Sequence, residues 1–216
     1  MDRDLRLPPD QATFDQRVIP VRDTLTEKKR SWFRLHRVAY PNQFFPSKGS
    51  RLTPSSGNFS CVYLAASLET TVAEVWGDRL AALRDAGGSI YVITESQAKQ
   101  WSYLKTPVLP LGMRLCDLTD RDTRLASGIE SGTLYSTDLA VPQLWAERIA
   151  RHPAHFDGIL YRSRHTDELC LVLWIRPERK PPLEHLLRFE SAGAFCDSEA
   201  SHIIAGKIGV RLAFTR

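Results

Sequence analysis

The apolar and polar positions between residues 44 and 83 predict a loop, a short strand and an amphipathic helix, in that order. Gly49 and Gly57 lie among serines, which is the composition of turns rather than of a regular element. Residues 61–66 (CVYLAA) are apolar on both faces, as expected of a strand covered on two sides. Ser67 is a suitable N-cap for a following helix. In that helix apolar residues recur at 3.6-residue spacing: Leu68, Val72, Val75, Trp76, Leu80 and Leu83.

A second informative stretch begins at Phe156 and predicts two more strands. Residues 156–165 contain a strand that ends in polar residues, and residues 170–175 (CLVLWI) form an apolar run of the length of a buried strand. The two strands suggest a hairpin. Its mouth presents Ser163, Arg164 and His165.

The rest of the pattern predicts elements on both sides of these stretches. The polar segment 120–136 predicts a loop with a short helix, and the proline-containing residues after 176 are expected to form loops. Strands and helices do not alternate regularly, and no glycine-rich nucleotide-binding motif is present, so the order favours a mixed α+β fold. Further strands are predicted at residues 32–38, 89–94, 113–118 and 210–214, and a further helix at residues 142–150.

Size and charge are those of one globular domain with extensions, or of at most two small domains. The chain has 216 residues, of which 43% are hydrophobic and 25% charged, so it can bury a core without a metal or a disulfide. The formal net charge of +4 is a mild excess with no long basic run. This charge suits an anionic small molecule better than a nucleic acid.

The cysteines, histidines and N-terminus exclude several classes of protein. The four cysteines lie far apart and form no C-x-x-C pair, and the histidines have no metal-ligand spacing, so we expect neither a disulfide framework nor a metal site. The N-terminus lacks the apolar segment of a signal peptide, and no run approaches the roughly 20 residues of a membrane span. We therefore expect a cytoplasmic protein that does not enter a membrane.

Three residues of the first stretch carry side chains that an active site can use. Glu74 lies off the apolar stripe of its helix, and on pattern alone this is typical of a solvated glutamate. Arg51 alone is typical of a surface-loop cation, and Tyr63 of a core tyrosine with a satisfied hydroxyl. Residues 163–165 are likewise typical of a solvated turn. The pattern alone assigns none of these residues a function.

Four motifs in sequence order resemble the RES domain family, and the resemblance covers residues 32–175. It implies an ADP-ribosyltransferase-like α+β fold, in which two small mixed or antiparallel sheets form a central cleft with flanking helices. We therefore divide the chain into a polar, proline-containing N-terminal extension (1–30), a RES domain (31–191) and a C-terminal extension (192–216) packed on the same domain. The motifs are F-F-x-x-x-G-x-R at residues 44–51, V-Y-L-A-x-S at 62–67, A-E-V at 73–75 and F-D-G-I-L-Y-R-S-R at 156–164.

The family resemblance implies NAD as the substrate and no metal. Cleavage of the bond between nicotinamide and ribose leaves an oxocarbenium-like ribose, which the carboxylate of Glu74 would stabilise. Arg51 would offer two donors to the pyrophosphate, and Tyr63 would stack on the nicotinamide ring. The Ser163 hydroxyl would bond to the carboxamide or to a ribose hydroxyl, and Arg164 would assist with the phosphates.

The family arginine has two alternatives in this chain. Family members often have an aromatic residue after that arginine, whereas this chain has Leu52. Arg34 and Arg37, in the predicted strand at residues 32–38, therefore remain candidates beside Arg51.

The family includes the toxins of RES–Xre toxin–antitoxin pairs. The resemblance therefore implies an NAD-consuming toxin restrained by an Xre-like helix-turn-helix antitoxin. It leaves open whether ADP-ribose passes to water, to phosphate or to a protein, and whether the toxin is a homodimer. The alternative is a catalytically inactive protein of this fold that binds NAD or ADP-ribose. Direct binding to nucleic acid rests only on the mild positive charge and is not expected.

Overall fold

The computed structural model describes most of the chain. The described residues are 7–24, 30–40, 45–46, 50–56, 59–88, 90–106, 108–110, 112–136, 138–176 and 178–213. The predicted loop residues Gly49 and Gly57 lie outside them, as do Phe44 at the start of the first family motif and Phe214 at the end of the last predicted strand.

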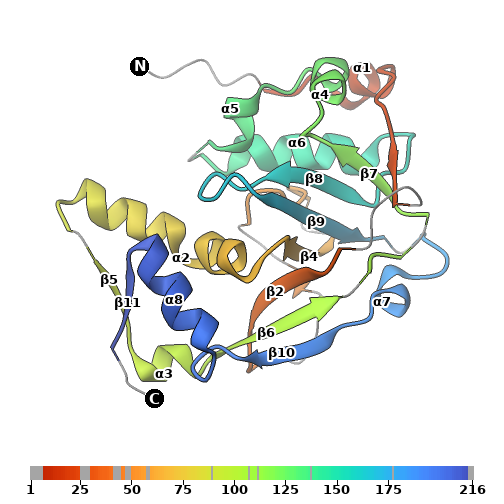
Figure 1. The fold of residues 1–216 in the computed structure, drawn as a ribbon. Helices are drawn as coiled ribbons and strands as arrows, with labels where there is room; N and C mark the ends of the chain where they lie inside the picture. The colour runs from red at the N-terminus through yellow and green to blue at the C-terminus, as the bar shows by residue number, and fades with distance from the viewer. Residues whose placement is uncertain are drawn as a thin grey trace.

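The backbone pairs into a nine-stranded mixed sheet and a separate two-stranded parallel sheet (Figure 1). The order of the large sheet is β1-β7-β8-β9-β4-β2-β6-β10, and β3 also pairs with β4. The small sheet consists of β5 and β11. The strands are β1 (Arg22–Asp23), β2 (Trp32–Arg37), β3 (Phe45–Pro46), β4 (Ser60–Ala65), β5 (Tyr91–Ile93), β6 (Trp101–Thr106), β7 (Arg114–Asp117), β8 (Gly158–Arg162), β9 (Leu169–Ile175), β10 (Glu190–Ala194) and β11 (Val210–Leu212).

The α+β class is confirmed, but the expected pair of small sheets is corrected. Strands β2 and β4 join the two halves of the large sheet through the single register pair Phe33–Ala65 among the described residues. By contrast, β2 pairs with β6, and β4 with β9, along their whole lengths. One half therefore holds β1, β7, β8, β9, β3 and β4, and the other holds β2, β6 and β10. The Phe33–Ala65 pair is therefore the one place, among the described residues, where the backbones of the two halves pair.

Helices of unequal length cover these sheets. In Figure 1, α6 lies along β8, while α2 and α8 lie beside each other near the small sheet. Helices α3, α4, α5 and α7 are short. The helices are α1 (Gln11–Asp15), α2 (Leu68–Asp85), α3 (Glu95–Ala98), α4 (Arg121–Ser127), α5 (Ser131–Leu134), α6 (Ala140–Arg151), α7 (Leu183–Leu186) and α8 (Glu199–Ile208).

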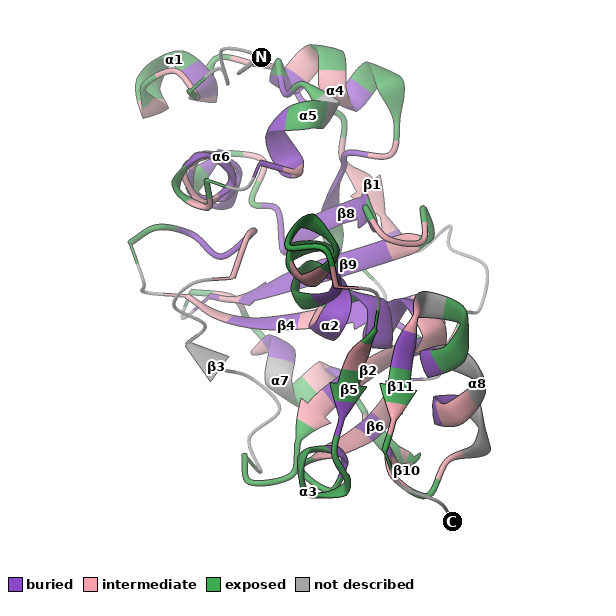
Figure 2. Cartoon of the chain, turned by 90° about the vertical axis from the view of Figure 1, so that its left-hand side faces the viewer, coloured by how far each residue is buried: buried purple, intermediate pink, exposed green. Residues whose placement is uncertain are grey.

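The predicted strand and helix at the centre of the sequence are confirmed as β4 and α2. The Ser67 hydroxyl accepts a hydrogen bond from the Thr70 amide, as expected of an N-cap. Val72 and Trp76 are buried against the side of β2 and β6, whereas Glu74 is exposed, as its place off the apolar stripe predicts. Figure 2 shows buried residues concentrated in β4, β8 and β9, which explains why their sequences are apolar on both faces.

The N-terminal segment packs on the domain along its described length. Phe14 of α1 is fully buried against Trp145 of α6, with ring centroids 5.9 Å apart. Arg148 of α6 donates from Nε to the Pro9 carbonyl at 2.8 Å, and β1 extends the large sheet by pairing with β7. The boundary expected at residue 30 stays a prediction, but residues 7–24 share one core with α6.

The prediction that the residues after 176 form loops is partly wrong, because this segment contains α7, β10 and α8. Glu190–Ala194 (ESAGA) has no apolar pattern, yet it forms β10, because its backbone pairs with β6 at the edge of the sheet. Helix α8 follows and buries Ala205 in the cluster that contains Val72 and Trp76 of α2. Strand β6 was also absent from the sequence expectation, and Tyr103 at its centre is fully buried.

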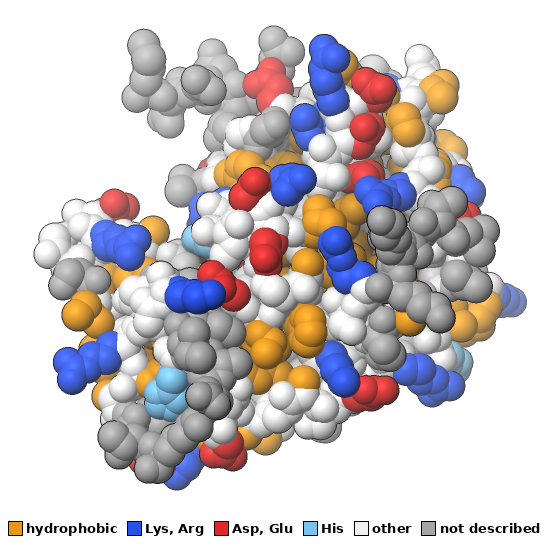
Figure 3. All heavy atoms as spheres, in the orientation of Figure 1, with side chains coloured by type: hydrophobic (Ala, Val, Ile, Leu, Met, Phe, Trp, Pro, Cys, Tyr) orange, Lys and Arg blue, Asp and Glu red, His pale blue; other side chains and the backbone are white. Residues whose placement is uncertain are grey.

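The surface carries mixed charge. On the face seen in Figure 3, Lys and Arg side chains lie interspersed with Asp and Glu side chains, and apolar side chains lie between them. Within the described ranges, no helix combines the length and the apolar character that crossing a membrane requires.

We expect Gly158→Ala to destabilise the fold, because an added Cβ would lie 2.0 Å from the Val172 carbonyl oxygen of the paired strand β9. Backbone must shift to relieve this contact, so the free energy of unfolding should fall by about 2 kcal/mol in urea denaturation. Gly132→Ala is the matched control, because its Cβ would meet no atom within 4 Å. A loss of stability as large for Gly132→Ala would contradict this explanation.

Candidate functional site

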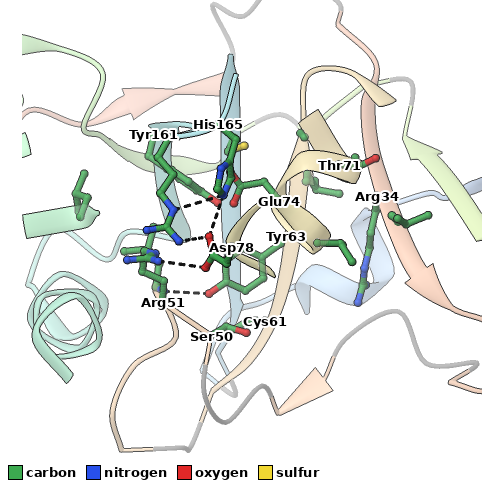
Figure 4. Close-up of a pocket in the computed structure, with 18 of the residues that line it drawn as sticks. Arg34, Ser50, Arg51, Cys61, Tyr63, Thr71, Glu74, Asp78, Tyr161 and His165 are labelled. Carbon is green, nitrogen blue, oxygen red and sulfur yellow. Dashed lines mark hydrogen bonds and ion pairs between the residues drawn. The ribbon is translucent and has the colours of Figure 1, made fainter. Parts of the chain in front are cut away.

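A cavity of about 440 Å³ opens where the two halves of the large sheet separate (Figure 4). Its walls come from β2, β4, the loop at residues 50–52, helix α2 and the mouth of the β8–β9 hairpin. Four of the five predicted site residues line it directly. The lining residues are Phe33, Arg34, Leu35, Ser50, Arg51, Leu52, Cys61, Tyr63, Leu64, Ala65, Thr71, Glu74, Val75, Asp78, Leu134, Tyr135, Leu139, Tyr161, Arg164, His165 and Cys170.

Glu74 is held by the fifth predicted residue. The Ser163 hydroxyl donates to Glu74 Oε1 at 2.6 Å, and the His165 amide donates to the same Ser163 oxygen at 3.2 Å. Ser163 itself is buried, being 2% exposed. The exposed face of α2 therefore faces the cavity at Glu74, so the solvated glutamate predicted by the pattern is a cavity glutamate.

Asp78 lies one helical turn after Glu74 and contacts two arginines and a histidine of the site. Its carboxylate pairs with the Arg164 guanidinium, with His165 Nε2 at 3.0 Å and with Arg51 Nη2 at 3.6 Å (Figure 4). The side chains of Arg164 and His165 are only 24% and 18% exposed. The expectation that these hairpin charges are solvated is therefore wrong for His165, because the turn folds its ring against α2, whereas Arg164 as a whole residue is exposed.

Burial sets the ionisation of the cations around the cavity. It lowers the pKa of Arg51, while the nearby Glu74 carboxylate acts in the opposite direction. It also lowers the pKa of Arg164, and the positive charge of Arg51 lowers it further. For His165, burial lowers the pKa against the raising effect of Glu74, so the imidazole is mainly neutral at pH 7. Burial lowers the pKa of Arg34 to about 10.

Gly77 allows the hairpin to approach helix α2 closely. A Cβ at Gly77 would lie 2.6 Å from Cε1 and Nδ1 of His165. Glu74, Gly77 and Asp78 share one helical face, since they are three and four residues apart. Glu74 accepts from the Ser163 hydroxyl, and Gly77 lies against the His165 ring. Asp78 pairs with the Arg164 guanidinium and lies within hydrogen-bond distance of His165 Nε2.

The Tyr63 ring lines the cavity while its hydroxyl anchors the loop that carries Arg51. This hydroxyl accepts from the Leu52 amide at 3.1 Å and also lies 3.1 Å from the Thr53 hydroxyl. Burial raises the pKa of Tyr63 well above its ordinary value, so the phenol is neutral. The Arg51 side chain leaves this loop and donates from Nη1 to the Ser136 carbonyl.

The two alternative arginines differ in position. Arg34 of β2 lines the cavity, as Arg51 does. Arg37, further along β2, lies instead over the ring of Trp101, 5.3 Å from its centroid. The geometry therefore keeps Arg51 and Arg34 as candidates for a substrate-binding arginine and separates Arg37 from them.

Asp78, Tyr135 and Tyr161 also line the cavity but were not predicted from the sequence. Asp78 had an available signal, because it follows Glu74 by four residues and must share its helical face. Tyr161 is the last of four consecutive buried residues in β8 and gave no signal of its own. Across the part of the chain that the structure describes, no three or more His, Cys, Asp or Glu side chains cluster so as to hold a metal ion.

We expect Gly77→Ala to displace the His165 ring from α2. The ring would become less buried, so the pKa of His165, which burial holds below 6.5, should rise toward that value. Titration of the histidine side-chain signals by NMR measures this change. Gly206→Ala in α8 is the control, because its Cβ would meet no atom within 4 Å. An unchanged His165 titration in Gly77→Ala would refute the close approach.

Comparisons with known proteins agree with this fold. The fold is similar to that of a chain in the crystal structure of the M. tuberculosis MbcT–MbcA toxin–antitoxin complex. The matched chain is 18% identical, with a TM-score of 0.55, over 85% of this chain and 91% of that chain. This similarity concerns the fold. A comparison of the sequence with curated proteins finds no match.

The family assignment comes from the sequence. The family model described as RES domain matches residues 31–189, which is most of the chain and includes every residue that lines the cavity. The match also contains all four motifs at which the resemblance was first seen. The chain therefore belongs to the RES domain family.

Proposed function

We propose that this protein cleaves the bond between nicotinamide and ribose in NAD, and that it is the toxin of a toxin–antitoxin pair. The observation that carries the proposal is the meeting of the Glu74 carboxylate with the guanidinium groups of Arg51 and Arg164 around one cavity. Membership of the RES domain family supports NAD as the substrate. The volume of about 440 Å³ lies within the roughly 300–1,000 Å³ of small-molecule sites.

Glu74 is proposed as the catalytic carboxylate. Cleavage leaves the bonding electron pair on the nicotinamide nitrogen and a positive charge on the ribose carbon, which a nearby carboxylate stabilises. The hydrogen bond from Ser163 at 2.6 Å fixes the direction of this carboxylate. Ser163 thus has a positioning role besides the contact with the carboxamide or a ribose hydroxyl that the family resemblance implies.

Arg51 and Arg164 are proposed to bind the pyrophosphate. Both guanidinium groups now point at one carboxylate, that of Asp78, so their donors already converge on an anion. A planar guanidinium bonds two phosphate oxygens as readily as two carboxylate oxygens. The lowered pKa of each arginine reflects burial, and a bound anion would offset that cost.

Tyr63 is proposed to stack on the nicotinamide ring. Its hydroxyl accepts from the Leu52 amide and lies beside the Thr53 hydroxyl, so the ring axis is held at both ends. A fixed aromatic face beside the catalytic carboxylate suits a planar leaving group. This arrangement also links the stacking residue to the loop that carries Arg51.

An Xre-like helix-turn-helix antitoxin is the proposed partner. The M. tuberculosis protein of similar fold was crystallised as a toxin–antitoxin complex, which supports a protein partner of that kind. The proposed location is the cytoplasm, without direct binding to nucleic acid, in keeping with the mixed charge in Figure 3. The family resemblance does not decide whether the protein forms a homodimer.

We expect Glu74→Gln to abolish nicotinamide release, because the amide keeps the size of the side chain but cannot neutralise a cationic ribose. Release from NAD, followed by NMR on the purified protein, should fall at least about 100-fold. Assays with and without phosphate identify the acceptor: loss of activity without phosphate indicates a phosphorylase, and undiminished activity in water a glycohydrolase. A requirement for added protein would indicate a transferase.

Glu69→Gln is the matched control for this experiment. Glu69 belongs to the same helix but lines a second cavity of about 390 Å³ and pairs with Lys207 at 3.2 Å. Its variant should keep wild-type activity. Equal activity of Glu74→Gln and wild type would refute the catalytic role of Glu74. Saturable NAD binding without release in the wild type would instead favour the alternative, an inactive protein that binds NAD or ADP-ribose.

A further inference from the structure

The loop at residues 50–56, which carries Arg51, is bound at both ends by helix α6. Near its start, Gln143 Nε2 donates to the Ser50 carbonyl at 3.1 Å. At its end, the Ser56 amide donates to Glu147 Oε2 at 3.0 Å. Gln143 and Glu147 are four residues apart, so they project from one face of α6 and reach the loop together.

Glu147 is a buried carboxylate whose burial calls for an explanation. The residue is 5% exposed, and its side chain bonds the Ser56 amide through Oε2 and Arg151 Nε through Oε1. Burial alone raises the pKa of Glu147, but the hydrogen bonds from Ser56 and Arg151 outweigh it and hold the pKa below its ordinary value. A buried charge is costly unless such bonds are made. One of its two partners is therefore the loop, and Glu147 is not among the residues that line the cavity.

The centre of the same loop is bound from the sheet. The Leu52 amide donates to the Tyr63 hydroxyl of β4, and the Leu52 carbonyl accepts from Trp174 Nε1 of β9 at 3.1 Å. Between these fixed points the Arg51 side chain projects into the cavity and reaches Asp78 of α2. The sheet therefore fixes the middle of the loop, and α6 fixes its two ends.

We propose that Glu147, together with Gln143, is a positioning residue for substrate binding, which holds the Arg51 guanidinium at its place in the cavity by bonding both ends of its loop. Glu147 does not line the cavity, so it acts through the loop alone. The inference rests on the proposed function in so far as Arg51 binds the NAD pyrophosphate. The anchoring of the loop is independent of that function.

The test compares Glu147→Ala with the wild type in two assays. Without an acceptor for the Ser56 amide, the loop should open more often, so limited trypsin digestion should cleave after Arg51 at least about 5-fold faster. Mass spectrometry of the fragments identifies this cleavage. In the NAD assay, KM should rise at least about 5-fold while kcat stays within about 2-fold, because Glu74 and Ser163 are unaltered.

Three further variants separate positioning from general stability. Arg151→Ala removes the other partner of the same carboxylate and should leave cleavage and KM at wild-type values. Glu147→Gln keeps an oxygen that accepts from the Ser56 amide and should restore most of the wild-type KM. Gln143→Ala removes only the bond from Gln143 to the Ser50 carbonyl and should change both quantities in the same direction by less. It also tests the proposal if Glu147→Ala does not fold.

The outcomes distinguish the two proposals. Unchanged cleavage after Arg51 in both Glu147→Ala and Gln143→Ala would overturn the anchoring, whatever the enzyme does. Faster cleavage with an unchanged KM would overturn the positioning role and leave the anchor. Equal effects of Arg151→Ala and Glu147→Ala would also overturn it, as they would reflect loss of the ion pair. If the wild type neither releases nicotinamide nor binds NAD, the proposed function fails, and this outcome leaves the anchoring of the loop unaffected.

Discussion

The single register pair between β2 and β4 is the constraint on which this structure depends. Among the described residues only Phe33 and Ala65 face each other there, whereas each strand pairs fully with its other neighbour. Cross-strand packing therefore continues within each half of the sheet but not between the halves. The space left at the junction becomes the cavity, with residues from β2 on one wall and from β4 on the other. Helix α2 and the hairpin mouth close that space, so the site is a consequence of incomplete strand pairing.

Helix α2 converts this space into a chemical site by presenting three residue types on one face. Glu74 and Asp78 bring negative charge, and Gly77 between them provides room for an imidazole. The hairpin mouth supplies the matching groups in consecutive positions, since Ser163 is bound to Glu74 while Arg164 and His165 are bound to Asp78. A register error of one residue in the β8–β9 hairpin would reverse which of these side chains face the helix. The precision of the site thus depends on strand pairing some distance from it.

Much of the central fold could be predicted from sequence, because the apolar periods of residues 61–85 and 156–175 are strong and local. The residues of the site were harder to predict from the sequence. Glu74 looked like a surface residue because helical periodicity reports burial by protein and does not distinguish solvent from a cavity. His165 was misjudged for the same reason, since a turn sequence does not reveal the helix against which it folds. Strand β10 could not be predicted, because its pairing with β6 and not its side chains determines its conformation. Glu147, finally, lies on a helix whose pattern predicts core packing, and its partner is a backbone amide 91 residues away in the chain.

The carboxylate of Asp78 has a further consequence for any anion that enters the cavity. Two arginines already share this carboxylate, so an incoming anion does not find bare positive charge but must exchange with a resident counter-ion. Affinity is then a difference between two ion-pairing energies, and weakly charged or monodentate anions gain little from the exchange. A pyrophosphate, with several oxygens to offer two guanidinium groups, gains more. We therefore expect anions with several oxygens to compete with Asp78 for these arginines better than simple salts do.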